Sequence, residues 1–374
     1  MNNPLLKKIL PHALAILLFL VVSVLFCKPA LEGNVLVQHD NVGWKGMAQN
    51  SFEYKAQHGH FPLWNPNLFS GMPNYQVAME GKSVLPDMIK LITLGLPKPI
   101  NFFFLACICF YILTLALGIR PLIGMIGSLA YAFSTYNAVI VFAGHDTQML
   151  ATGLMPLLLA GLLFLYEKKY WMGIALTTYG AYQQIGVNHL QVTYYFIIIA
   201  TLITIGYLVK WIREREFKHM MISGGLAILA AVIGVMSNAL VLKTTSEYAK
   251  FTMRNGKDVE IVGDSVKTTK TTGLDTSYAF EYSVGKGETF TLFMPESFGG
   301  STSKLGDESS HVVKKLTDAG YNESDDLQLA SKLPKYWGEL PSTAGPAYLG
   351  IFIFLFGLIG FFTVKHTVRW GLLA

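Results

Sequence analysis

The chain has 374 residues, of which 52% are hydrophobic and only 14% are charged, and its mean hydropathy is +0.41. This composition excludes an ordinary soluble globular domain and predicts a polytopic membrane protein. The formal net charge of +5 does not indicate a nucleic-acid partner, because the basic residues fall between apolar segments rather than on one amphipathic face. Cys27, Cys107 and Cys109 lie in or beside apolar segments, so we expect no disulfide framework.

The apolar residues fall into eight segments, which we interpret as spans of a bilayer whose core is about 30 Å thick. The first runs from about Ile9 to Phe26 after Lys7 and Lys8, and no signal-peptidase pattern follows it, so it predicts a retained anchor. The others lie at about Ile100–Gly118, Pro121–Ala143, Met149–Tyr166, Trp171–Gly186, Val192–Val209, Met220–Leu242 and Ala347–Val364. We therefore expect an all-α helical membrane protein with about eight transmembrane helices.

The distribution of basic residues predicts the orientation of these spans, because Lys and Arg near span ends stay on the cytoplasmic side. With the N-terminus inside, the inner segments hold such residues as Lys168, Arg213 and Lys365, whereas the two short outer turns hold none. We therefore expect a multi-pass membrane protein with both ends of this chain in the cytoplasm.

Two large intervals, residues 28–99 and 243–346, then form extracytoplasmic loops. The second is rich in turns and could be α+β, with a strand expected at Thr289–Met294 and a short helix within Glu308–Tyr321. We treat residues 1–374 as a single membrane domain. The last residues, Trp370–Ala374, are typical of the start of another span, so we expect this domain to be the N-terminal part of a longer chain.

Acids and histidines from three separate connections face the outer side in this topology. Asp40 follows the first span, His145 and Asp146 form the turn between spans three and four, and His189 lies in the turn between spans five and six. Such groups at the membrane border are costly unless they are paired, hydrated or metal-bound. They could simply be solvated turn residues. Alternatively, Asp40, His145, Asp146 and His189 could hold a divalent metal, Mg²⁺ or Mn²⁺ by their carboxylates or Zn²⁺ by their imidazoles.

Several common signatures are missing from the sequence. It has no Walker A motif, no Gly-x-Gly-x-x-Gly after a strand, no His-Glu-x-x-His and no Cys-x-x-Cys. Nucleotide-driven transport and zinc-protease chemistry are therefore not indicated.

The polar stretch from Gln38 to Gln76 carries a resemblance. Asp40, Trp44 and Glu53 precede the string Pro62-Leu-Trp-Asn-Pro-Asn-Leu-Phe-Ser-Gly-Met-Pro73, and the later Pro295-Glu-Ser-Phe-Gly-Gly300, Tyr336-Trp-Gly338 and Gly345-Pro-Ala-Tyr-Leu-Gly350 accompany it. Together these residues resemble the YfhO-type bacterial membrane protein family, over essentially the whole chain. That family is similar to the GT-C superfamily of glycosyltransferases, which use polyprenyl-phosphate sugars.

The resemblance implies a multi-pass glycosyltransferase of the bacterial cytoplasmic membrane that moves a sugar from a polyprenyl-phosphate donor to a cell-envelope polymer or lipid on the extracytoplasmic face. Asp40 matches the acidic residue that serves as the catalytic base in the first outer loop, and Glu53 is a second catalytic candidate or orients that loop. Asp146 matches a later metal-binding acid only by its location. The donor phosphate needs a cation, and Lys243, Lys250 and Arg254 are available just outside the seventh span, although they could equally be solvated surface charges.

Two functions of other classes remain open at this stage. A transporter or flippase of a lipid-linked glycan would need ionisable residues or broken helices near the middle of the bilayer, and such residues are nearly absent. A non-catalytic assembly protein could use the outer loops to bind an envelope polymer. An Asp40→Asn variant that is expressed but inactive would favour the enzyme over the assembly protein.

Overall fold

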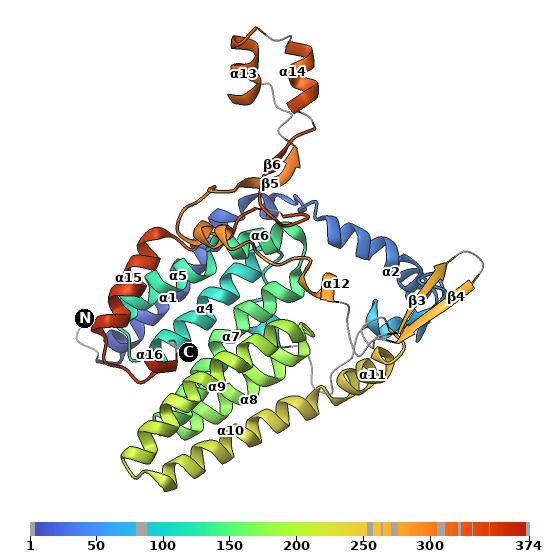
Figure 1. Cartoon of the computed structure of the whole chain (residues 1–374). Coiled ribbons are helices and arrows are strands. Elements are labelled where there is room, and N and C mark those ends of the chain that lie inside the picture. Colours follow the sequence, from blue (N-terminus) through green and yellow to red (C-terminus); the bar gives the residue numbers. More distant parts are fainter. Residues whose placement is uncertain are drawn as a thin grey trace. The chain divides into compact units, whose positions relative to one another are not determined.

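The chain is mostly helical in the computed structural model (Figure 1). The structure describes residues 4–79, 88–252, 257–262, 265–270, 276–304, 311–320, 323–330, 332–343 and 345–371. Within these ranges, five helical segments are long and apolar enough to cross a membrane. The prediction of a helical, multi-pass membrane protein is confirmed at this level.

These five segments coincide with predicted spans. They are α1 (Pro4–Phe26), the pair α5 (Pro121–Ala132) and α6 (Thr135–Ala143), α7 (Asp146–Tyr166), α9 (Leu190–Arg213) and α10 (Phe217–Ser237). The other three predicted spans are helical but shorter: α4 (Ile100–Ala116) and α8 (Tyr170–Gly186) have 17 residues each, and α15 (Ile351–Thr363) has 13.

The chain divides into two compact units, which we describe separately. The first comprises residues 1–133, 144–248 and 359–374, and the second comprises residues 134–143 and 249–358. In the first unit α7 is the central helix: it packs against α4, α8, α9 and α10, and 78% of its apolar stretch is buried. The corresponding fractions for α1, α9 and α10 are only 17%, 28% and 22%, as expected of helices that face lipid.

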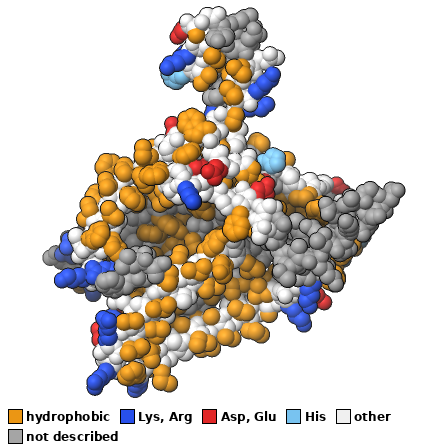
Figure 2. All heavy atoms as spheres, viewed as in Figure 1, with side chains coloured by type: hydrophobic (Ala, Val, Ile, Leu, Met, Phe, Trp, Pro, Cys, Tyr) orange, Lys and Arg blue, Asp and Glu red, His pale blue; other side chains and the backbone are white. Residues whose placement is uncertain are grey.

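Large hydrophobic side chains are correspondingly exposed along the outer helices (Figure 2). Ile197 of α9 and Ile228 of α10 are 55% and 67% exposed. In water such a surface would be unfavourable, since each square ångström of exposed apolar area costs roughly 25 cal/mol. A bilayer removes that cost.

Glycines bring the central helices into backbone contact. A Cβ atom on Gly161 of α7 would lie 2.5 Å from the Thr177 nitrogen of α8, and one on Gly173 of α8 would lie 2.6 Å from the Leu165 nitrogen of α7. Small residues allow this approach, which membrane helices need because lipid offers no hydrophobic driving force between them. Gly234 of α10 is packed in the same way, with Cβ of Ala181 2.7 Å from its Cβ position, whereas nothing lies within 4 Å of a Cβ built on Gly224 or Gly225.

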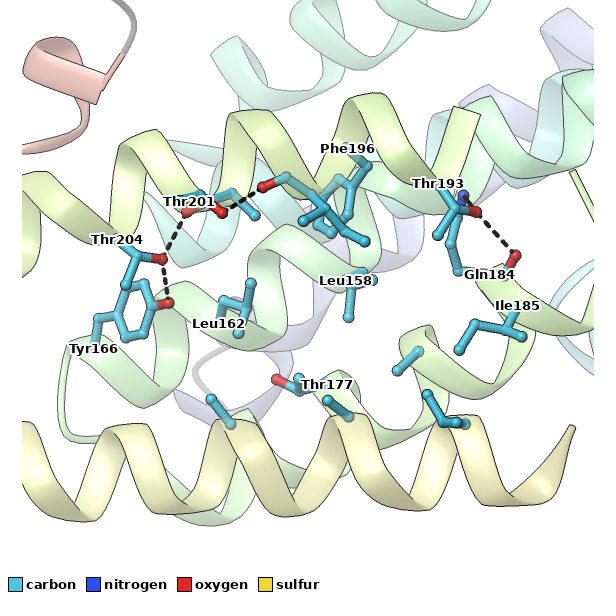
Figure 3. A pocket seen from close by; sticks show the side chains of 16 residues that line it. Leu158, Leu162, Tyr166, Thr177, Gln184, Ile185, Thr193, Phe196, Thr201 and Thr204 are labelled. Atoms are coloured by element: carbon cyan, nitrogen blue, oxygen red, sulfur yellow. Dashed lines mark hydrogen bonds between the residues drawn. The ribbon is translucent and has the colours of Figure 1, made fainter. Parts of the chain in front are cut away.

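A cavity of about 310 Å³ lies among α7, α8, α9 and α10 (Figure 3). Its walls are mostly aliphatic and aromatic, including Leu158, Leu162 and Phe196. Among its polar groups, the hydroxyls of Tyr166 and Thr204 are 2.7 Å apart and Gln184 donates to Thr193 at 3.3 Å, whereas Oγ1 of Thr177 and Oε1 of Gln184 are buried without a hydrogen-bond partner. Because its walls are mostly apolar, the cavity suits an apolar chain.

The polar stretch after α1 folds around two buried asparagines. It forms α2 (His39–His58), the two-residue strands β1 (Trp64–Asn65) and β2 (Met72–Pro73), and α3 (Ile89–Ile92). Asn74 accepts a hydrogen bond from Ser51 of α2 at 2.7 Å, and Asn65 donates to the Met47 carbonyl at 3.3 Å. These bonds attach the Trp64–Pro73 string to α2, so the string has a structural role there.

The second unit contains short elements. They are η4 (Gly287–Leu292), strand β5 (Gly299–Lys304) paired with β6 (Pro334–Tyr336), the β3–β4 hairpin (Lys257–Val262 and Ser265–Lys270), α12 (Thr276–Phe280), α13 (His311–Asp318) and α14 (Glu323–Ala330). The expected helix within 308–321 corresponds to α13. The strand expected at Thr289–Met294 is wrong, because most of that segment belongs to the 3₁₀ helix η4, in which the Thr291 hydroxyl bonds back to the Glu288 carbonyl at 2.7 Å.

The predicted orientation can be tested by cysteine labelling. In intact cells, we expect a membrane-impermeant maleimide to label Ser70→Cys and Ser301→Cys, because both positions lie in the predicted outer loops. Glu214→Cys, in the exposed turn after α9, is the matched inner control and should react only after permeabilisation. The native cysteines are buried, which keeps the background low. The reverse pattern would overturn the orientation.

Candidate functional site

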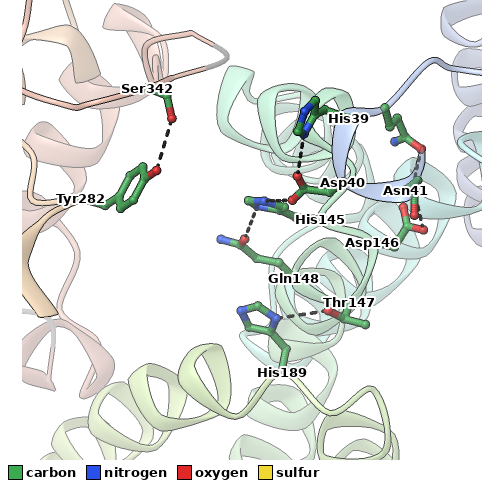
Figure 4. Close-up of polar contacts among 11 residues, drawn as sticks. His39, Asp40, Asn41, His145, Asp146, Thr147, Gln148, His189, Tyr282 and Ser342 are labelled. Carbon is green, nitrogen blue, oxygen red and sulfur yellow. Dashed lines mark hydrogen bonds and ion pairs between the residues drawn. The ribbon is translucent and has the colours of Figure 1, made fainter. Parts of the chain in front are cut away.

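The helices α2, α7 and α9 bring their N-terminal ends to one place (Figure 4). Each begins beside a histidine: His39 is the first residue of α2, and His145 and His189 are the N-caps of α7 and α9. Neither of these N-caps uses its side chain to cap its own helix. Helix N-termini carry unpaired N–H groups and about half a positive charge each, so their convergence favours a negatively charged ligand.

Asp40 and His145 form a direct pair across this junction. The Nε2 atom of His145 lies 2.8 Å from Oδ2 of Asp40, and Nδ1 of His39 lies 3.6 Å from Oδ1 of the same carboxylate. Both side chains of the pair are about half exposed, at 52% for Asp40 and 47% for His145. Asp40 also sits in the first turn of α2, where the helix dipole stabilises a carboxylate. The pair is therefore accessible to a substrate from solvent.

The second nitrogen of His145 has its own partner. Nδ1 lies 3.0 Å from Oε1 of Gln148, one turn into α7. Each ring nitrogen thus lies beside an oxygen atom of a neighbouring side chain. These two contacts hold the ring in place between Asp40 and α7.

Asp146 lies deeper and pairs with a lysine. Its carboxylate is 18% exposed, and Oδ2 contacts the ammonium of Lys98 and accepts a hydrogen bond from Asn41 at 3.4 Å. Its other oxygen, Oδ1, is buried without a hydrogen-bond partner. Because Asn41 follows Asp40 on α2, the two carboxylates belong to one polar cluster.

His189 joins the cluster through Thr147. The hydroxyl of Thr147 lies 3.2 Å from Nδ1 of the imidazole. Burial lowers the pKa of His189 below 6.5, and the nearby His145 lowers it further. The neutral ring is therefore favoured. The structure thus brings together Asp40, His145, Asp146 and His189, the four residues that the sequence analysis proposed from three separate connections.

The turn that makes these contacts depends on Gly144. Its φ of +95° is in the left-handed region, and a Cβ there would lie 3.1 Å from Cβ of Gln38 and 3.3 Å from the Asn41 nitrogen. Glycine is therefore needed both for the backbone conformation and for the close approach of α2. This approach places Asp40 against His145.

The remaining candidates lie elsewhere. Glu53 is on α2, thirteen positions beyond Asp40 and thus about 20 Å along the helix; it accepts a hydrogen bond from Gln49 at 2.8 Å. Lys243 is exposed on α11 (Ala239–Ala249), Lys250 follows that helix in the second unit, and Arg254 lies outside the described residues. The structure therefore does not bring Glu53 to the cluster.

The cluster as it stands does not fit a metal ion well. Among the residues that the structure describes, no group of three His, Cys, Asp or Glu side chains is arranged to hold one. The Lys98 ammonium also contacts Oδ2 of Asp146, and it would repel a metal cation bound to the same carboxylate. The metal role of the four residues stays a prediction.

Sequence reasoning missed Lys98, Asn41 and Gln148. Lys98 belongs to the predicted first outer loop and lies two residues before α4. A cation next to a predicted span, with an acid in another predicted outer turn, is the signal that could have identified it.

Comparison of the chain with protein-family models, with curated proteins and with solved structures gave no match.

Replacing Gly144 by Ala tests whether α2 packs closely against this turn. We expect the G144A variant to lose about 1–3 kcal/mol of stability from backbone strain, with a further loss from crowding against Gln38. Gly118 is the matched control: its φ is +72°, but nothing lies within 4 Å of its Cβ position, so G118A should show the strain alone. Thermal unfolding in detergent measures both. Equal losses would mean that α2 does not press against Gly144.

The lowered pKa of His189 predicts the direction of one pH effect. Because the unfolded chain takes up the proton first as the pH falls, this residue contributes stability that is complete above about pH 6.5 and is lost as the pH falls towards the pKa of the folded state. The free energy of unfolding, measured from pH 8 to pH 5, should therefore fall more steeply for the wild type than for H189Q.

An NMR titration of the H145Q variant should show a higher pKa for His189 than in the wild type, because the charge of His145 no longer lowers it. A His189 pKa above 6.5 in the wild type would contradict the assignment.

Proposed function

We propose that this protein is a membrane glycosyltransferase that moves a sugar from a polyprenyl-phosphate donor to a cell-envelope polymer or lipid outside the cytoplasmic membrane. The observation that carries the proposal is the accessible Asp40–His145 pair at the junction of three helix N-termini. The junction combines a carboxylate that can take a proton with surroundings that attract an anion, and sugar transfer from a lipid phosphate needs both.

Asp40 acts as the general base in this proposal. As the acceptor oxygen bonds to the anomeric carbon, the carboxylate takes the hydroxyl proton, a role that contributes about 10²- to 10⁴-fold in rate. The contacts with His145 and His39 orient the carboxylate. A single displacement of this kind inverts the anomeric centre.

Fixed positive charge next to the base would stabilise the leaving phosphate. The first turns of α7 and α9 offer backbone N–H groups, and Lys98 offers an ammonium whose side chain is 56% exposed. Lys98 belongs to the same cluster as Asp40, which makes it a better candidate for the donor phosphate than Lys243 on α11. No step here depends on a divalent cation, and a requirement for Mg²⁺, Mn²⁺ or Zn²⁺ is a separate prediction.

The membrane setting follows from the donor, because its polyprenyl chain has to stay in apolar surroundings. The cavity among α7, α8, α9 and α10 would accept such a chain. In the proposal, about eight helices form a GT-C-like bundle, and the junction lies at its outer mouth. The resemblance of the Pro62–Pro73 string and its companions to the YfhO-type family supports this architecture.

The decisive variant is Asp40→Asn, which keeps the size and polarity of the side chain but removes the proton acceptor. We expect sugar transfer by the purified protein to fall by about 10² or more while donor binding survives. Glu53→Gln is the matched control, since it removes a carboxylate from the same helix about 20 Å away; it should transfer sugar at nearly the wild-type rate. Transfer and donor binding are measured separately, with a radiolabelled lipid-linked sugar.

Other outcomes point to other functions. If Asp40→Asn transferred sugar at the wild-type rate, the carboxylate would be structural, and Asp146 would be the next base to test. If neither the wild type nor any variant transferred sugar, but lipid-linked glycan crossed vesicles containing the protein, a flippase would replace the enzyme. Binding of an envelope polymer without either activity would indicate an assembly protein.

A further inference from the structure

A second polar cluster lies at the opposite ends of α7 and α9, where the chain turns into α8 and α10. Figure 2 shows basic side chains gathered at the end of the bundle where α9 passes into α10. A cavity of about 320 Å³ lies between the two turns, lined by Lys168, Tyr170, Arg215, Glu216, Lys218 and His219. In the predicted topology this end faces the cytoplasm, so it is separate from the Asp40 junction.

The two turns have the same backbone form. In the first, Lys168 has a φ of 64°, and the next residue, Lys169, donates to the Phe164 carbonyl at 2.8 Å. In the second, Arg215 has a φ of 57°, and Glu216 donates to the Trp211 carbonyl at 2.8 Å. Glycine normally occupies this left-handed position because a side chain strains it. Here both positions carry long cations instead.

The floor of the cavity is built from buried, hydrogen-bonded groups. His219 is only 6% exposed; its Nε2 donates to the Tyr166 carbonyl at 2.8 Å, and its Nδ1 lies 2.7 Å from the Tyr170 hydroxyl. This arrangement fixes Tyr170 at the wall. Ser223 lies 3.2 Å from the same Nδ1 and donates to the Leu165 carbonyl at 3.0 Å. The site is therefore held in place before any ligand arrives.

The charges of the lining residues favour an anion. Lys168 forms an ion pair with Glu216, in which Nζ lies 2.5 Å from Oε1. This contact raises the pKa of Lys168 and lowers the pKa of Glu216. Arg215 and Lys218 are exposed, and no ion pair to either is recorded in the part of the chain that the structure describes. The lining therefore has three cations and one carboxylate, so its net charge is positive.

The neighbouring indole indicates the level of this cavity in the membrane. Trp171, next to Tyr170, is 89% exposed at the start of α8. An indole at the end of a membrane helix typically lies among lipid headgroups. The cavity beside it is thus placed where phospholipid phosphates lie.

We propose that this cavity binds a phosphate ester through Arg215 and Lys218, with the headgroup of an anionic phospholipid as the favoured source. The guanidinium can hold two phosphate oxygens at once, and the lysine adds a point charge. The strained cation at position 215 is explained by this role, since a glycine there would relax the turn but lose the contact. The proposal does not depend on the glycosyltransferase function.

Titration of the purified protein with lipid tests the site, with bound lipid counted by native mass spectrometry. We expect phosphatidylglycerol to bind more tightly than phosphatidylcholine of the same acyl chains. The R215G/K218Q variant should lose about 25-fold in affinity for phosphatidylglycerol, about fivefold for each charge. The K7Q/K8Q variant is the matched control, because it removes two cations at the same predicted side from α1, and it should bind like the wild type.

A second measurement separates the site from a merely structural role of the arginine. R215G alone should unfold at the same temperature as the wild type or higher, because strain is relieved, and yet bind phosphatidylglycerol about fivefold more weakly. Equal phosphatidylglycerol affinity in R215G/K218Q and the wild type would overturn the proposal. If glycerol 1-phosphate bound as tightly as the lipid and with the same loss in the variant, the ligand would be a soluble phosphate ester and the lipid source would be overturned.

Discussion

The burial of α7 is the constraint on which the first unit depends. This helix is covered by α4, α8, α9 and α10, and its contact with α8 is close enough that Gly161 and Gly173 have no room for a Cβ. Both of its ends are therefore held in place. The N-terminal end presents His145 and Asp146, and the C-terminal end leads into the turn that carries Lys168.

The same helix supports two clusters of different character. At its beginning, carboxylates and imidazoles meet at exposed helix N-termini, which suits proton transfer beside an anion. At its end, long cations surround a small cavity with a buried His219 as its floor. Rigid helix packing keeps these two clusters apart, about 30 Å for the 21 residues of α7 at 1.5 Å per residue.

The conspicuous sequence motif that follows α2, the Trp64–Pro73 string, has mainly a structural role. The Trp64–Pro73 string attaches to α2 through buried Asn65, Asn74 and Ser51, and it presents no acid or imidazole to the junction. Its effect on the candidate site is indirect, because it holds the helix whose first turn carries Asp40. The densest sequence motif therefore contacts the middle of α2, whereas the candidate catalytic residue Asp40 lies in the first turn of the same helix.

The sequence by itself determined the helical segments and the membrane class, because hydrophobicity sums locally over about 20 residues and needs no partner. It also identified Asp40, His145, Asp146 and His189 as candidate site residues on one predicted side of the membrane, since charge and topology can be read residue by residue.

Only the tertiary structure decided which of these residues contact one another. The contact between Asp40 and His145 spans more than a hundred residues and depends on the left-handed Gly144 turn against α2. The same geometry leaves Glu53 about 20 Å along α2 and brings Lys98 to Asp146, because helical rise and close packing, rather than residue type, set those distances.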